Sequence, residues 1–150
     1  MTPPPPSSGL ANSSTVGGPP GAGETILLID DDDIVRNTTR RMLEYKGYRV
    51  IEGVNGQDGL EAYQREREKI GLIFLDLQMP DMTGQEVLAQ LRTIDPQVKV
   101  AYLSGSAQGK VDLEHVYAFV HKPFTFTSLL QTTRRILDCN SLEEAKQSDL

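Results

Sequence analysis

The sequence has one cysteine, no apolar run long enough to span a membrane, and no cluster of basic residues. Cys139 cannot form an internal disulfide, so a free thiol is the simplest interpretation. The amino terminus lacks the positive and apolar segments of a signal peptide, which favours a cytoplasmic location without a membrane partner. The 15 Lys and Arg residues against 21 Asp and Glu give a net charge of −6, which disfavours direct nucleic-acid binding.

Composition divides the 150 residues into three parts. Residues 1–23 are rich in Pro, Gly and Ser and hold few apolar side chains, which predicts a disordered tail or linker. Residues 140–150 are polar and are expected to form a flexible carboxyl-terminal tail. Residues 24–139 are long and apolar enough for one domain with its own core.

Short apolar runs alternate with amphipathic segments in this central part. Apolar runs without polar alternation are typical of strands covered on both faces, and apolar residues at every third or fourth position predict helices. The expected strands are 25–29, 48–52, 71–75, 98–103 and 116–120. The expected helices are 33–46, 57–69, 85–93 and 125–138, with a weaker segment at 106–114. The alternation predicts an α/β fold with a five-stranded parallel sheet and helices on both faces.

Polar residues follow four of the expected strands. Asp30 and Asp31 follow the first strand and Asp76 the third, while Ser104 follows the fourth and Lys122 lies just past the fifth. The carboxyl ends of parallel strands meet at one edge of the sheet, where such folds bind ligands. The three carboxylates would repel one another there, and a hard divalent cation would relieve that repulsion. The sequence therefore predicts a site for Mg²⁺, with Mn²⁺ as an alternative.

Four motifs stand at these strand ends: LLIDDD at 27–32 with Arg36 beyond it, LDLQMPDMTG at 75–84, YLSGS at 102–106 and HKPF at 121–124. Together and in this order they resemble the receiver domain of two-component response regulators. The resemblance covers about residues 25–138. It implies a flavodoxin-like, doubly wound sheet with the strand order 2-1-3-4-5.

The resemblance also implies how the edge residues act. Asp76 would accept a phosphoryl group from a sensor histidine kinase or a phosphotransfer protein. Mg²⁺ would be held by Asp30, Asp31, Asp76 and the main-chain carbonyl of Gln78. Lys122 would neutralise phosphoryl oxygens as charge shifts in the transition state. The domain would catalyse only its own phosphorylation and dephosphorylation, so it is not expected to be an enzyme in the usual sense.

Signalling would follow from a conformational switch. Ser104 would donate a hydrogen bond to the bound phosphoryl group, and Phe119 matches the mobile aromatic residue of the family. Gly105 would leave the approach to Asp76 open. A downstream protein of unknown identity and a phosphorylation-dependent dimer are the expected outputs. Only seventeen residues separate Ser104 from Lys122, which is short for the family and implies an abbreviated helix between them.

Several alternatives stay open. Asp32 and Asp33 fit a helix cap, and the run of four aspartates also allows a pair of metal ligands shifted by one residue. The stretch LLIDDDDIV also fits the nucleophile motif of haloacid-dehalogenase-like phosphatases, with Asp30 as nucleophile and Asp32 as acid and base. We expect a single-domain regulator, and the alternatives are the receiver module of a hybrid sensor kinase and a binding module that never turns over phosphate.

Overall fold

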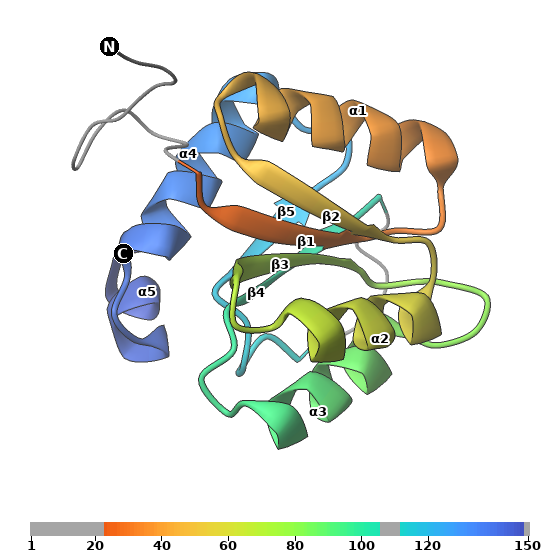
Figure 1. Cartoon of the computed structure of the whole chain (residues 1–150). Helices are drawn as coiled ribbons and strands as arrows, with labels where there is room; N and C mark the ends of the chain where they lie inside the picture. The colour runs from red at the N-terminus through yellow and green to blue at the C-terminus, as the bar shows by residue number, and fades with distance from the viewer. Residues whose placement is uncertain (1–22, 106–111, 149–150) are drawn as a thin grey trace, which may run out of the picture.

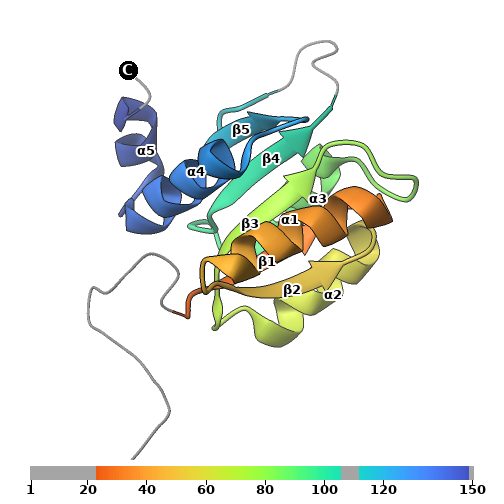
Figure 2. The ribbon, with the colours of Figure 1, turned by 90° about the horizontal axis from the view of Figure 1, so that it is seen from above.

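The computed structural model describes residues 23–105 and 112–148. Its five strands form one parallel sheet in the order β2-β1-β3-β4-β5, which confirms the predicted flavodoxin-like order. The strands are β1 (Thr25–Ile29), β2 (Arg49–Gly53), β3 (Ile70–Asp76), β4 (Val100–Ser104) and β5 (Ala118–His121). Figure 2 shows β2 and β5 at opposite edges of the sheet.

Helices cover both faces of the sheet (Figure 1). One face carries α1 (Asp33–Tyr45) and α4 (Phe126–Asp138), and the other carries α2 (Gly56–Glu66) and α3 (Gly84–Ile94). Ile26 and Leu28 of β1 pack in the core cluster under α1 and α4, whereas Leu27 and Ile29 pack in the cluster under α2 and α3. Because successive strand residues face opposite sides, a strand buried on both faces reads as a continuous apolar run.

The structure departs from the expected flexible tail after residue 139. Residues Leu142–Ser148 form a short helix, α5, beside α4. The Ser141 hydroxyl accepts the main-chain N–H of Glu144 at 3.2 Å, and the Glu144 carboxylate accepts the N–H of Asn140 at 3.3 Å. Ala145 is fully buried in the core cluster under α1 and α4. These two hydrogen bonds satisfy N–H groups at the helix start, and together with the buried alanine they favour a helix in this polar segment.

Two expected segments lie wholly or partly outside the described residues. The expected tail over residues 1–23 falls there except for its last residue, and so do residues 106–111 of the weak helical segment. The described remainder of that segment, residues 112–114, is not helical. Among the described helices, none combines the length and the apolar character needed to cross a membrane.

Candidate functional site

The first acidic residues of the site directly follow β1. The Asp30 side chain is fully buried, while Asp31 is exposed. One carboxylate oxygen of Asp30 accepts the main-chain N–H of Asp32 at 2.9 Å, and the other accepts the Lys122 ammonium at 2.8 Å. Both oxygens of the buried carboxylate are therefore held in fixed directions.

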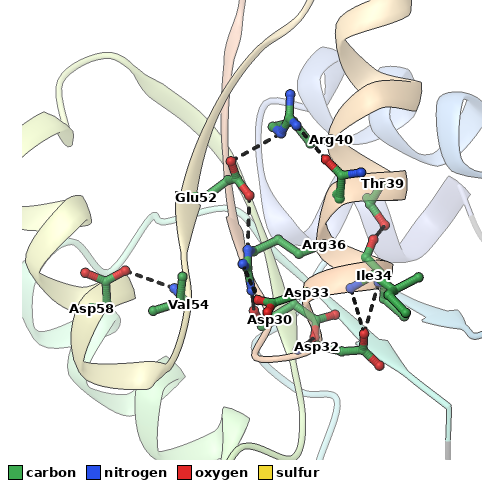
Figure 3. Close-up of polar contacts among 12 residues, drawn as sticks. Asp30, Asp32, Asp33, Ile34, Arg36, Thr39, Arg40, Glu52, Val54 and Asp58 are labelled. Carbon is green, nitrogen blue, oxygen red and sulfur yellow. Dashed lines mark hydrogen bonds and ion pairs between the residues drawn. The ribbon is translucent and has the colours of Figure 1, made fainter.

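The next two aspartates begin α1. The Asp32 carboxylate caps the helix by accepting the N–H groups of Ile34 at 3.0 Å and Val35 at 3.1 Å (Figure 3). Asp33 is the first helical residue, and its carboxylate pairs with Arg36 at 2.6 Å. These contacts use the Asp32 and Asp33 carboxylates to stabilise the start of α1, as their position in the sequence favours. Asp30 and Asp31 are left to face the other strand ends.

Asp76 completes a group of three carboxylates. It is the last residue of β3 and is 7% exposed. One oxygen from each of Asp30, Asp31 and Asp76 lies within 4.8 Å of the others. The Lys122 ammonium is 3.8 Å from Asp76, and the main-chain N–H of Gln78 donates to the same Asp76 oxygen at 3.3 Å. Three acidic side chains and one lysine thus converge from β1, β3 and the end of β5.

The electrostatics of Asp76 fit a cation site. Burial raises the pKa of the Asp76 carboxyl to about 7, and the negative charge of Asp30 adds to this, while Lys122 and the N–H of Gln78 act in the opposite direction. Burial and like charge therefore make the ionised form of Asp76 costly at neutral pH. A divalent cation that prefers oxygen ligands would offset this cost, so the donor set fits Mg²⁺ or Mn²⁺.

The loop behind Asp76 is tightly closed. Gln78 and Thr83 form an isolated antiparallel bridge, and the Gly84 N–H donates to the Leu77 carbonyl at 2.8 Å. A Cβ on Gly84 would lie 2.8 Å from the Asp76 carbonyl oxygen and 2.9 Å from the Leu77 Cα. Only glycine fits there without displacing the backbone that carries Asp76, which explains the last glycine of the LDLQMPDMTG motif.

The remaining expected residues come from β4 and β5. Ser104 is 3% exposed at the end of β4, and its carbonyl accepts the Lys122 N–H at 2.8 Å. Gly105 is exposed, and a Cβ built on it would make an ordinary van der Waals contact with the Lys122 Cβ at 3.7 Å. Phe119 is half-buried and meets the Tyr102 ring edge-on, with ring centroids 6.4 Å apart.

Two residues near the site had no role in the sequence interpretation. The Asp81 carboxylate reaches the start of α2 and accepts the N–H groups of Gly56 at 3.0 Å and Gln57 at 2.9 Å. Arg36, noted only as part of a motif, contacts the Asp30 main chain. Asp81 and its partners lie at least 24 residues apart, so local periodicity could not reveal the contact.

Comparisons with known proteins identify the family of this chain. A family model described as the response regulator receiver domain matches residues 26–134. The chain is 30% identical over 102 residues to sensor kinase CckA of Brucella abortus, and this match covers 65% of the chain but 11% of that kinase.

Solved structures share the fold. A CheY-like receiver domain protein of Methanospirillum hungatei gives a TM-score of 0.67 at 28% identity and covers 83% of this chain and 98% of that one. A chain in the complex of histidine kinase ThkA with response regulator TrrA gives a TM-score of 0.69 at 24% identity, covering 77% of this chain and 99% of that one.

Proposed function

The chain belongs to the family of response regulator receiver domains, and on this premise we propose that it accepts a phosphoryl group on Asp76 in an Mg²⁺-dependent reaction. The observation that carries the proposal is the convergence of Asp30, Asp31 and Asp76 within 4.8 Å, with Lys122 beside them. Receiver domains are signalling modules, so the proposed output is a change of conformation rather than turnover of a substrate.

The proposed step is a displacement at phosphorus. A carboxylate oxygen of Asp76 forms a bond to phosphorus while the bond to the donor's leaving group breaks, and the electron pair remains on that group. The Lys122 ammonium lies close enough to Asp76 to neutralise the charge that develops on the phosphoryl oxygens. Asp30, Asp31, Asp76 and the Gln78 carbonyl would hold Mg²⁺, which would supply positive charge for the same oxygens when bound.

The proposed switch uses the neighbouring strand ends. A phosphoryl group on Asp76 adds negative charge and acceptor oxygens, which favours approach of the Ser104 hydroxyl and Lys122. Both residues lie on the adjoining β4 and β5 strand ends, and Phe119 lies in register with Tyr102 on the same two strands. Movement of Ser104 would thereby be coupled to Phe119, while exposed Gly105 leaves the phosphoryl group room to enter.

The proposed phosphodonor is a histidine kinase or a phosphotransfer protein in the cytoplasm. The similarity to part of a sensor kinase and the fold shared with a response regulator in a kinase complex both support this partner class. A stand-alone regulator and the receiver module of a hybrid kinase both fit the domain. The downstream protein and the phosphorylation-dependent dimer stay predictions.

The haloacid-dehalogenase alternative fits the structure less well. Its nucleophile would be Asp30, whose carboxylate is fully buried with both oxygens already accepting hydrogen bonds. Asp76, which lies in the same cluster, would have no role in that chemistry.

Phosphorylation with a small donor tests the proposal. We expect the chain, incubated with acetyl phosphate and Mg²⁺, to gain one base-labile phosphate by intact mass and to show amide chemical-shift changes reaching Phe119. Asp76→Asn should gain none. Asp32→Asn is a matched control, because asparagine also caps helices and Asp32 lies outside the carboxylate group. Phosphate retained in Asp76→Asn contradicts the assignment, and phosphate mapped to Asp30 would support the phosphatase alternative.

A further inference from the structure

Arg36 of α1 makes three polar contacts, two of them with the run of four aspartates that begins at Asp30. It is 9% exposed. One terminal nitrogen donates to the Asp30 main-chain carbonyl at 2.7 Å, and the other pairs with the Asp33 carboxylate at 2.6 Å. Its Nε donates to Glu52 of β2 at 3.0 Å (Figure 3). A single planar guanidinium therefore connects the end of β1, the start of α1 and the end of β2.

These contacts fix the main chain of Asp30 on both sides. The Asp30 N–H donates to the Gly53 carbonyl at 3.1 Å, and the Asp30 carbonyl accepts from Arg36. That carbonyl lies in the same rigid plane as the N–H of Asp31, because the peptide bond does not rotate freely. Holding the carbonyl therefore holds the peptide unit that joins a buried carboxylate to an exposed one.

We propose that Arg36 is a positioning residue for the cation site, which sets the relative orientation of the Asp30 and Asp31 carboxylates through the peptide between them. This inference rests on the cation binding of the proposed function. Glu52 takes part by orienting the guanidinium. Partners that orient metal ligands from behind commonly change metal affinity when they are removed.

Two other roles for Arg36 predict different results. If the guanidinium acted only through its positive charge, its removal would strengthen cation binding, because Asp33 and Glu52 would lose their neutralising partner. If it only packed α1 against the sheet, its removal would lower stability but leave the affinity of the folded protein for Mg²⁺ unchanged.

Calorimetric titration with Mg²⁺ alone, well below the unfolding temperature, separates these roles. We expect Arg36→Lys and Arg36→Met each to weaken Mg²⁺ binding about tenfold. Arg36→Lys keeps the charge but loses the planar fork, so it should not restore affinity. Arg40→Met is the matched control, since Arg40 lies one turn further along α1 and also contacts Glu52, at 3.2 Å, but has no described contact with Asp30. Its affinity should stay within about twofold of the parent.

Glu52→Gln keeps the inference testable if the Arg36 variants do not fold. It leaves Arg36 in place but weakens the contact that orients it, and we expect Mg²⁺ binding a few-fold weaker than in Arg40→Met. Unchanged or tighter binding in the folded Arg36 variants would overturn the inference. If the Arg36 variants are unfolded, equal Mg²⁺ affinities of Glu52→Gln and Arg40→Met would overturn the inference. Failure of the parent chain to bind Mg²⁺ would overturn the cation site itself, so the two failures are distinguishable.

Discussion

The two ends of the parallel strands differ in how their charged side chains are paired. At the amino ends, the ammonium of Lys99, which precedes β4, donates to the carbonyls of Ile136, Leu137 and Cys139 at the end of α4. Arg134 of α4 pairs there with Glu24 at 2.8 Å and with Asp138 at 2.9 Å. At the carboxyl ends, the carboxylates of Asp30, Asp31 and Asp76 lie close together. Among the described residues, Lys122 is the one basic side chain that pairs with them within 4.0 Å.

This difference separates stabilising charge from functional charge. Hydrogen bonding to Glu24 raises the pKa of Arg134 and so favours its charged form. Burial and the negative charge of Asp30 raise the pKa of Asp76 and so favour its neutral form. An arrangement that disfavours its own ionised groups is typical of binding and catalytic sites, because a ligand can supply the missing charge. Burial also lowers the pKa of Lys99 at the amino ends, but three carbonyls of the chain already accept hydrogen bonds from its ammonium, so no ligand is needed there.

The largest expected effect comes from neutralising Asp76. In EDTA at pH 8, Asp76→Asn should be more stable than the parent by on the order of 3 kcal/mol. The folded carboxyl has a pKa of about 7 against an ordinary 3.8, so the unfolded chain releases this proton first. The parent should lose stability relative to the variant as pH rises from about 4 to 7. Urea unfolding across this range measures the difference.

Mg²⁺ provides the control for that prediction. Saturating Mg²⁺ should stabilise the parent at pH 8 and should stabilise Asp76→Asn much less, because a ligand that binds the folded state raises its stability. A stability difference that does not change with pH would show that Asp76 is not the titrating group.

Lys99→Met should give the next largest effect. The substitution removes an ammonium that donates to three main-chain carbonyls, and we expect a loss of about 2 kcal/mol in the free energy of unfolding. The loss should be the same with and without Mg²⁺, since Lys99 lies at the opposite ends of the strands from the carboxylates. Lys69→Met, at an exposed lysine paired with Glu66, is the control and should change stability by less than about 0.5 kcal/mol. A smaller difference in stability between Lys99→Met and the parent in Mg²⁺ than in EDTA would contradict the comparison.

Asp81→Ala should have the smallest effect. Unlike the three clustered carboxylates, the Asp81 carboxylate has its charge stabilised by two main-chain N–H groups. Hydrogen bonds from the N–H groups of Gln57 and Gly56 lower the pKa of Asp81, so its contribution is present at neutral pH and is lost as pH falls below its ordinary 3.8. Loss of this helix cap should cost about 1 kcal/mol at pH 7. Thermal unfolding at pH 7 beside the exposed Glu61→Ala measures the cost; equal effects in both variants would refute the capping role.

The sequence by itself determined the class of fold and which polar residues follow the strands, while its resemblance to receiver domains supplied the strand order that the structure confirms. Strands such as β1 and β3 are largely apolar because both of their faces are buried over most of their length, so local composition revealed them. Residues that follow parallel strands share one edge of the sheet, and this rule predicts that Asp30, Asp76 and Lys122 lie together. Expected and observed strand bounds differ by no more than about two residues, as fraying of element ends leads one to expect.

Only the tertiary structure decided how Asp30 and Asp31 differ. The sequence already favoured Asp32 and Asp33 for the helix start, and α1 does begin at Asp33 with Asp32 as its cap. The folded layers bury Asp30 against Lys122 and leave Asp31 exposed. The contact between Arg36 and Glu52, the cap that Asp81 gives α2, and the packing of α5 were likewise absent from any local pattern. Periodicity reports which face of an element is buried, whereas these contacts join elements far apart along the chain and depend on how the folded layers meet.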